Sequence, residues 1–352
     1  MPRFSIIVPS HGVKGLLPRT LDSVLAQSYG DFELITVCDE PETPAADITA
    51  EYAKQDSRVA PAYSPPSAGL SAARTTGLRE ATGAYLLFLD GDDTLVPGAL
   101  AALDARLRET GPVDVLHFEH ERVHWRSDPT HTPPLPPTPA GTFTPDAAPR
   151  LTSVDRPAWS AAYRRGFLTA HQLVFPYGHF TDLGWGGMVT VTAERMAVLR
   201  SVVVRHLLRP QGSRLDLPGA HQLDLLDQVE LVLFQAAEQR LSAARRDALF
   251  DQLFAVALRT AADPRRLPAR HRRAFFRRAG VLYRRHLRAG HRAPGGSVGV
   301  QHRLLALGAY TAFHALRHAH RSATRARDGI SSPGWRSGGA AWLRAGIRGV
   351  TR

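Results

Sequence analysis

Short apolar runs alternate with amphipathic segments over residues 1–90. The apolar runs have the length of buried strands, and the segments between them carry apolar residues at helical spacing. We expect strands at 4–9, 32–38, 59–63 and 84–89, and helices at 16–26, 48–54 and 68–81. Because strand–helix–strand units join parallel strands, the pattern predicts an α/β fold with a mainly parallel sheet.

The pattern becomes less regular between residues 95 and 220. It predicts a strand at 113–118 and helices at 100–108, 158–168 and 185–199. Eight prolines fall between 129 and 149, so we expect 127–149 to be a loop or insertion without regular structure.

Amphipathic helices replace this pattern after residue 222. We expect them at 223–237, 243–260, 268–288 and 304–316. The segment after Asp328 is rich in Gly, Ser and Arg, which is typical of a disordered tail.

Charge is distributed unevenly around the net value of +12. Residues 1–110 carry 9 basic and 15 acidic side chains, 111–239 carry 11 and 13, and 240–352 carry 24 and 4, which gives −6, −2 and +20. The basic helices suggest a surface for anionic lipid headgroups, and a solvated helical bundle with arginine-rich composition is the alternative. No nucleic-acid reading module accompanies the charge, so we expect no nucleic-acid partner.

The amino-acid composition also indicates the class of protein and its cellular compartment. The apolar fraction of 43% and the charged fraction of 22% fit a globular protein, and the single cysteine, Cys38, excludes an internal disulfide framework. The apolar run at the N-terminus is too short for a signal peptide, and no segment reaches about 18 uninterrupted apolar residues. We therefore expect a cytoplasmic protein that can attach to the inner face of the cell membrane.

Three carboxylates follow the strand at 84–89 within four residues, in the sequence Asp90-Gly91-Asp92-Asp93. Mutual repulsion favours a cation beside such a cluster, and the carboxyl ends of strands are where open α/β sheets bind ligands. In the alternative, Asp93 caps a helix that begins near 95–97.

These elements and their motifs resemble family 2 glycosyltransferases of the bacterial type, which have the GT-A fold. The matching pieces are FSIIVPSHG, LPRTLDSVLAQSYGDFELITV, SAGLSAARTTGL, ATGAYLLFLDGDD, PAWSAAYRRGFL and YGHFTDLGW, within about residues 4–215. The resemblance implies a GT-A domain at 1–220, followed by a basic α-helical region at 221–328 and a disordered tail at 329–352. Within the GT-A domain, 1–110 would bind the nucleotide, and 111–220, with the insertion at 127–149, would bind the acceptor.

The resemblance also implies the site residues. Donor contacts are expected from Pro9, Ser10, His11, Asp39, Ser67, Arg74, Asp90 and Gly91. A Mg²⁺ or Mn²⁺ ion would be held by Asp90, Asp92 and Asp93, and further diphosphate contacts would come from Arg209 and Arg214.

Asp182 is the expected general base of an inverting transfer, and its alternative is the capping of a helix at 183–185. The chain departs from the family pattern at two acidic pairs, because Cys38 and Thr181 each replace one acid.

The function implied is transfer of a sugar from a nucleotide diphosphate donor to a hydroxyl of a cell-envelope glycan, polymer or lipid-linked acceptor. A nucleotidyltransferase and a noncatalytic GT-A scaffold at the membrane surface are the alternatives. A nucleotidyltransferase would carry a glycine-rich phosphate loop after the first strand, and residues 10–15 resemble such a loop only weakly. The departures from the family pattern at Cys38 and Thr181 support the noncatalytic scaffold.

Overall fold

A computed structural model describes most of the 352 residues of the chain. It describes residues 1–10, 15–38, 42–66, 68–124, 130–131, 134–149, 151, 156–208, 215 and 217–327. The chain divides into two compact units, Met1–Leu253 and Phe254–Arg352.

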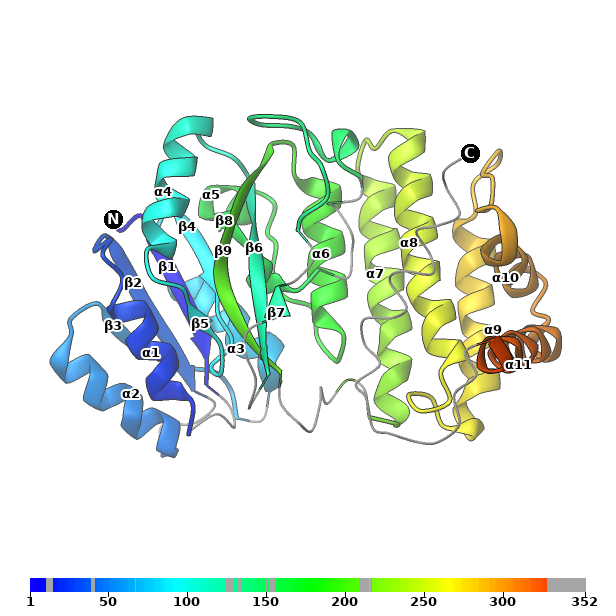
Figure 1. Ribbon diagram of the computed structural model, residues 1–352, viewed down its shortest axis with the longest axis horizontal. Coiled ribbons are helices and arrows are strands. Elements are labelled where there is room, and N and C mark those ends of the chain that lie inside the picture. Colours follow the sequence, from blue (N-terminus) through cyan, green and yellow to red (C-terminus); the bar gives the residue numbers. More distant parts are fainter. Residues whose placement is uncertain are drawn as a thin grey trace. The chain divides into compact units, whose positions relative to one another are not determined.

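A nine-stranded mixed sheet forms the centre of the first unit (Figure 1). The strands are β1 (Phe4–Pro9), β2 (Phe32–Cys38), β3 (Val59–Tyr63), β4 (Tyr85–Phe88), β5 (Thr94–Leu95), β6 (Val115–His124), β7 (Thr130–His131), β8 (Ala161–Arg164) and β9 (Met196–Leu208). Their order is β3-β2-β1-β4-β8-β6-β9-β5, with β7 beside β6. The first four are parallel, β8 runs antiparallel to both of its neighbours, and β9 is parallel to β6. The expected mainly parallel α/β sheet is confirmed.

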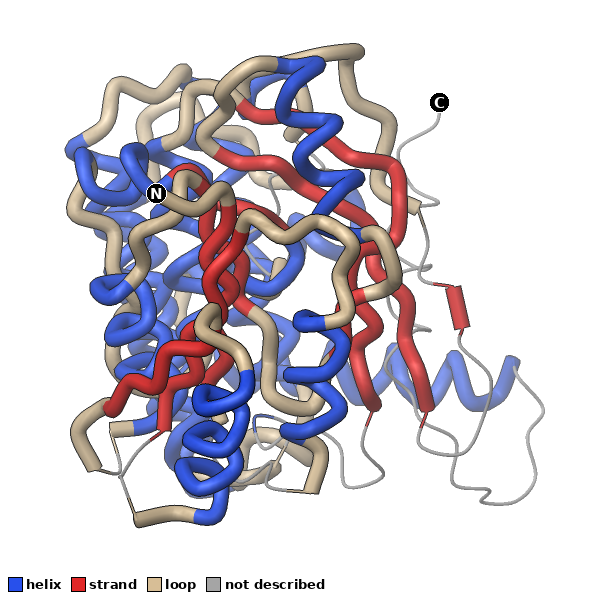
Figure 2. Tube along the Cα trace, turned by 90° about the vertical axis from the view of Figure 1, so that its left-hand side faces the viewer, coloured by secondary structure: helices blue, strands red, loops and turns tan. Residues whose placement is uncertain are grey.

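Helices cover the sheet, and Figure 2 shows them in blue around the red strands. The helices of the first unit are α1 (Leu17–Leu25), α2 (Pro44–Gln55), α3 (Gly69–Glu80), α4 (Ala99–Thr110), α5 (Arg165–Ala170), α6 (Thr181–Thr192), α7 (Asp224–Glu238) and the first part of α8 (Ala243–Ala262). Short 3₁₀ turns lie at Pro145–Ala147, Ala158–Ser160 and Ala220–Leu223.

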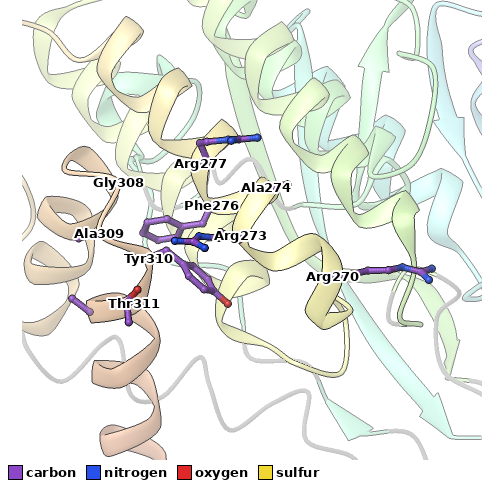
Figure 3. A pocket seen from close by; sticks show the side chains of 10 residues that line it. Arg270, Arg273, Ala274, Phe276, Arg277, Gly308, Ala309, Tyr310 and Thr311 are labelled. Carbon is purple, nitrogen blue, oxygen red and sulfur yellow. The ribbon is translucent and has the colours of Figure 1, made fainter.

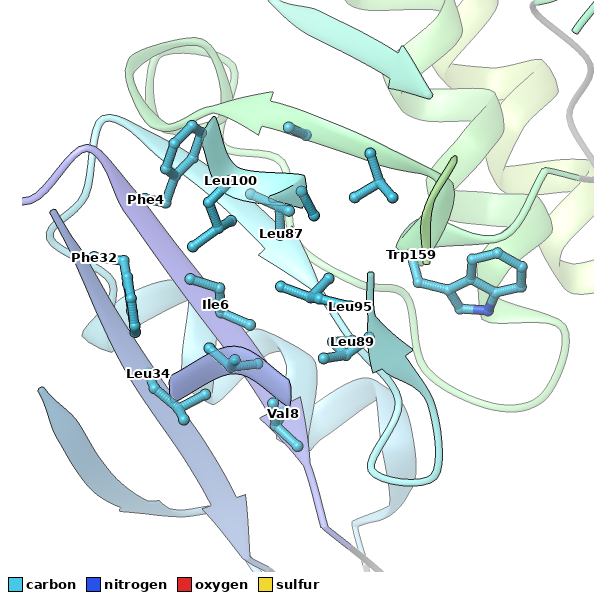
Figure 4. Packing of buried hydrophobic residues seen from close by; sticks show 14 of the residues in the cluster. Phe4, Ile6, Val8, Phe32, Leu34, Leu87, Leu89, Leu95, Leu100 and Trp159 are labelled. Carbon is cyan, nitrogen blue, oxygen red and sulfur yellow. The ribbon is translucent and has the colours of Figure 1, made fainter. Parts of the chain in front are cut away.

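The alternation of side chains along β1 explains why helices lie on both faces. Phe4, Ile6 and Val8 pack with the apolar sides of α1, α2 and α4 in one buried cluster, which Figure 4 shows in part. Ile7 points to the opposite face and packs in a second cluster with residues of α3, α5 and α6. With both faces covered, the strands need continuous apolar runs, and this is the pattern that the sequence displays.

The middle of the chain differs from the prediction. In place of the helix expected at 158–168, the structure has a 3₁₀ turn, strand β8 and the short helix α5. In place of the helix expected at 185–199, it has α6 followed by β9. The apolar run at 161–163 fits a buried strand as well as a helix. It forms a strand because it lies between β4 and β6 and pairs with both. The proline-rich segment also contains the short strand β7, paired with β6.

A helix starting near 95–97 is also absent. Thr94 and Leu95 instead form β5, which pairs with β9, and α4 begins at Ala99 after Gly98. The alternative in which Asp93 caps a helix is therefore wrong.

The second unit is helical. It contains the end of α8, α9 (Ala269–His286), α10 (Gly296–Ala306) and α11 (Tyr310–Arg327). Its core includes Phe275, Phe276, Tyr283, Leu305 and Phe313, all at most 2% exposed. The single helix expected at 304–316 is two helices, because the chain turns at Gly308, whose φ is +67°.

The domain boundary expected after residue 220 remains a prediction about the extent of the GT-A domain. Among the described residues, no helix combines the length and the hydropathy that a membrane crossing requires.

Candidate active site

The carboxyl ends of the parallel strands meet at one edge of the sheet. The backbone N–H of Ser10, after β1, donates to the Val37 carbonyl of β2 at 3.0 Å. The Ser10 hydroxyl bonds to the same carbonyl and lies 3.1 Å from the Cys38 sulfur. Leu89 donates to the Ile7 carbonyl at 2.9 Å, so Asp90 leaves β4 beside the end of β1. Pro9, Ser10, Asp90 and Gly91 therefore lie at a shared edge of the sheet. Their contacts with a donor stay a prediction.

Arg74 of α3 joins two of the predicted site carboxylates. Its Nη2 donates to Asp90 Oδ1 at 2.8 Å, and its Nη1 donates to Asp182 Oδ1 at 2.7 Å. Asp90 and Asp182 are 92 residues apart in sequence, and one guanidinium holds both. The sequence pattern predicts Arg74 as a contact for the donor diphosphate, and in this structure its two terminal nitrogens face carboxylates.

The Arg74 guanidinium is fully buried, whereas the side chains of Asp90 and Asp182 are 25% and 34% exposed. Burial alone lowers the pKa of Arg74, but the charges and hydrogen bonds of Asp182 and Asp90 outweigh this effect and raise the pKa above its usual value. The guanidinium carbon also lies 5.4 Å from the centre of the Phe175 ring. Arg74 is therefore a buried cation, and the two carboxylates that it holds are partly exposed.

Asp182 lies in the first turn of α6 and does not cap it. The helix is preceded by Phe180 in the left-handed conformation, with φ +59°, and no side chain caps its first turn. Asp182 Oδ1 accepts from Arg74 and from the Ala158 N–H at 3.2 Å. These two donors fix the carboxylate in place, which removes the capping alternative for this residue.

Asp93 is buried, in contrast to the partly exposed Asp90. It is 0% exposed, and its Oδ1 accepts from the Leu207 N–H of β9 at 2.9 Å. Both its oxygens lie within 3.1 Å of His206 Nδ1. Burial raises the pKa of Asp93 to about 6, against the opposing hydrogen bond and charge of His206. The expected ligand is thus engaged with β9 in this structure and anchors the acidic turn.

His206 is the residue of this site for which the sequence gives the weakest signal, because its partner Asp93 is 113 positions away. Burial lowers the pKa of His206, but Asp93 and then Asp90 and Asp92 raise it overall. The ring stacks on Trp159, with ring centres 4.7 Å apart and planes 23° apart. Trp159 is 5% exposed and Trp185 is fully buried, so both indoles belong to the protein interior.

The remaining predicted site residues lie outside the described part of the chain. They are His11, Asp39, Ser67, Arg209 and Arg214. Their expected contacts with a donor stay predictions.

The carboxylates at the edge suit a hard divalent cation. Asp90 and Asp92 are both partly exposed and follow a strand end, and carboxylate oxygens are ligands that Mg²⁺ and Mn²⁺ prefer. The described residues contain no cluster of three or more Asp, Glu, His or Cys side chains arranged to hold a metal. Two protein carboxylates match the way Mg²⁺ binds when phosphate oxygens and water supply the other ligands.

Comparisons with known proteins agree with this fold. Residues 5–171 match the family described as Glycosyl transferase family 2. Over 93 residues the chain is 40% identical to the uncharacterized glycosyltransferase EpsJ of Bacillus subtilis, covering 26% of this chain and 27% of EpsJ. Over 92 residues it is 37% identical to the B. subtilis putative teichuronic acid biosynthesis glycosyltransferase TuaG, covering 26% and 36%. The matches thus span only about a quarter to a third of these relatives.

The fold has a solved counterpart. Residues 1–349 of S. aureus TarS, crystallised in complex with UDP-GlcNAc, superpose with a TM-score of 0.74 at 17% identity, over 91% of this chain and 92% of that one. The similarity identifies the fold as GT-A with a helical C-terminal region.

Proposed function

We propose that this chain is a metal-dependent, inverting glycosyltransferase that moves a sugar from a nucleotide diphosphate donor to an acceptor hydroxyl. The observation that carries the proposal is the bridge from Asp90 through Arg74 to Asp182. It links a carboxylate suited to a donor-bound cation with a separate carboxylate suited to proton transfer, at the strand edge where α/β folds bind nucleotides.

The donor would lie along the ends of β1, β2 and β4. Pro9, Ser10 and Gly91 would line its nucleotide, together with the predicted contacts from His11, Asp39 and Ser67. Asp90 and Asp92 would hold Mg²⁺ or Mn²⁺, which supplies charge neutralisation for the departing diphosphate. Arg209 and Arg214 are proposed as further partners of the diphosphate.

Asp182 would act as the general base. Its carboxylate accepts the proton of the acceptor hydroxyl while that oxygen forms a bond to the anomeric carbon. The bond from this carbon to the diphosphate oxygen breaks on the opposite face, and the nucleoside diphosphate leaves with the electron pair. The configuration at the carbon inverts as a result. Arg74 and the Ala158 N–H would orient the carboxylate for this step.

The acceptor would be a cell-envelope glycan, polymer or lipid-linked sugar. The name of one similar protein supports this acceptor class, because TuaG is described as a putative teichuronic acid biosynthesis glycosyltransferase. The complex of TarS with UDP-GlcNAc supports a nucleotide diphosphate sugar as the donor. A lipid-linked or wall-polymer acceptor would bring the protein to a membrane surface, where its basic C-terminal third would favour attachment.

A donor panel tests the proposal. UDP-, GDP-, CDP- and dTDP-linked sugars are incubated with the full chain with and without Mn²⁺, and release of the nucleoside diphosphate is measured. We expect one donor class to be hydrolysed only when the divalent cation is present. No hydrolysis and no nucleotide binding under any condition would refute an enzymatic role and favour the noncatalytic scaffold.

Two variants separate the proposed roles. Asp92→Asn should lower metal-dependent donor turnover at least 100-fold, because a cation ligand is lost. Asp182→Asn should keep nucleotide binding and lower transfer to an acceptor at least 100-fold. The matched control is Asp47→Asn on the exposed surface of α2, which should change neither property. Full transfer by Asp182→Asn would exclude it as the base.

A further inference from the structure

A cavity of about 620 Å³ opens between α9 and the turn that joins α10 to α11 (Figure 3). It lies wholly within the helical unit, and none of its lining residues takes part in the proposed transfer reaction. Its volume is within the range of about 300–1,000 Å³ that is usual for small-molecule sites.

Three arginines of α9 line one side of this cavity: Arg270, Arg273 and Arg277. Their spacing of three and four residues puts them on one face of the helix, where like charges repel. All three are exposed, and none forms an ion pair with a carboxylate among the residues that the structure describes. A bound anion would relieve their repulsion.

The helical unit contains little negative charge to balance the three arginines. Asp263 is the single acidic residue in the described part of the helical unit, and it pairs with Arg265 at 3.0 Å. Another arginine of α9, Arg284, instead donates to the Ala306 carbonyl at 2.9 Å. Of the three cavity arginines, Arg270 donates from Nε to His271 Nε2 at 3.1 Å. Within the described residues, none of the three donates to a carboxylate or a carbonyl group, unlike Arg265 and Arg284.

The opposite side of the cavity is the start of α11. Thr311 and Ala312 line it, and no acceptor for their backbone N–H groups is recorded in the described chain, as is usual for the first turn of a helix. The positive end of the helix dipole thus adds to the charge of the arginines. Between the two sides, the buried ring of Phe276 meets the ring of Tyr310 edge to face, with ring centres 5.7 Å apart. The partly exposed Tyr310 ring supplies an apolar surface.

We propose that this cavity is a binding site for a phosphate or phosphodiester group with a short apolar or glycerol-like extension. Guanidinium groups bind phosphate oxygens through paired hydrogen bonds, and the Tyr310 ring would contact the carbon portion. The headgroup of an anionic lipid and a free phosphate ester both carry this chemistry. The site is independent of the transfer reaction proposed above.

The test compares two triple variants of the full chain with equal net charge. The cavity variant is Arg270→Gln with Arg273→Gln and Arg277→Gln. The control variant is Arg79→Gln with Arg240→Gln and Arg303→Gln, three exposed arginines that do not line the cavity. Binding of sn-glycerol 3-phosphate is measured by calorimetry, and binding to phosphatidylcholine vesicles with and without phosphatidylglycerol is measured by co-sedimentation. Circular dichroism verifies that both variants are folded.

We expect the cavity variant to lose at least tenfold in affinity for one of the two phosphate probes, and the control variant to stay within twofold of the original chain. Loss of binding to both probes identifies a site for phosphate esters in general, and loss confined to the phosphatidylglycerol vesicles identifies a lipid headgroup. Equal losses in the two variants would mean unspecific attraction by net charge and would overturn the proposal. Failure of the original chain to bind either probe would overturn it too.

Discussion

At the scale of single residues, Arg74 determines how the site is built. A fully buried guanidinium requires anionic partners, and Asp90 and Asp182 supply them from two different elements. The two carboxylates would repel each other without this cation. Arg74 thereby couples the stability of the protein to the geometry of its proposed chemistry.

Arg74→Met should lower both stability and transfer. Two charge-assisted hydrogen bonds are lost, so the free energy of unfolding should fall by about 2–4 kcal/mol, as measured by urea denaturation. Transfer should fall at least tenfold because Asp182 is no longer oriented. A purely structural role would leave Mn²⁺ binding unchanged or weaker, whereas we expect tighter binding by the folded variant, because a positive charge beside Asp90 is removed. Calorimetric titration with Mn²⁺ distinguishes these outcomes.

At the scale of elements, the position of α6 depends on close helix packing. A Cβ at Gly187 would lie 2.4 Å from Val232 Cγ2 of α7, closer than two non-bonded carbon atoms can approach. The glycine therefore permits α7 to press against α6, which carries Asp182 in its first turn. Contact between these two helices locates the proposed base relative to the sheet.

Gly187→Ala should lower the free energy of unfolding by about 1–3 kcal/mol through overpacking, in spite of the better helix propensity of alanine. Gly166→Ala in α5 is the matched control, because its Cβ would meet only Arg164 Nη1 at 3.5 Å. Thermal unfolding of the two variants measures the difference. Equal stability of the two variants would contradict the packing that we describe.

Strands β8 and β9 are the elements that the sequence did not reveal. Residues 161–164 and 196–208 contain apolar runs that fit either a strand or a helix segment. The free edges of β4 and β6 supply the hydrogen-bonding partners that decide between the two states. Pairing of this kind is non-local, so no window of the sequence contains it.

At the scale of the whole molecule, buried histidines make folding sensitive to acid. His117 is 7% exposed, and within the described chain neither of its ring nitrogens has a hydrogen-bond partner. Burial, with a smaller contribution from the charge of Arg156, lowers its pKa well below 6.5. In the second unit, burial and His291 lower the pKa of His302 to about 4. Each unit thus contains a histidine that remains neutral when folded.

The sign of the effect follows from proton binding. Below pH 6.5 the unfolded chain protonates His117 and the folded protein does not, so the free energy of unfolding falls as pH decreases and is unaffected above that range. The slope for one such group is about 1.4 kcal/mol per pH unit. His117→Leu should show a shallower decline than the original chain between pH 6.5 and 5 in urea denaturation. Parallel curves would show that His117 does not remain neutral.

The sequence by itself determined the parallel half of the sheet, the edge that gathers Ser10 and Asp90, and the basic helices of the last third. These features follow from the periodicity and the charge of short stretches of the sequence. The tertiary structure alone decided that Arg74 holds Asp90 and Asp182 together and that Asp93 turns toward His206. These contacts join residues 16 to 113 positions apart. A buried charge needs a partner of opposite charge, and tertiary packing determines which groups lie within hydrogen-bonding distance of it. Local sequence patterns do not predict that packing.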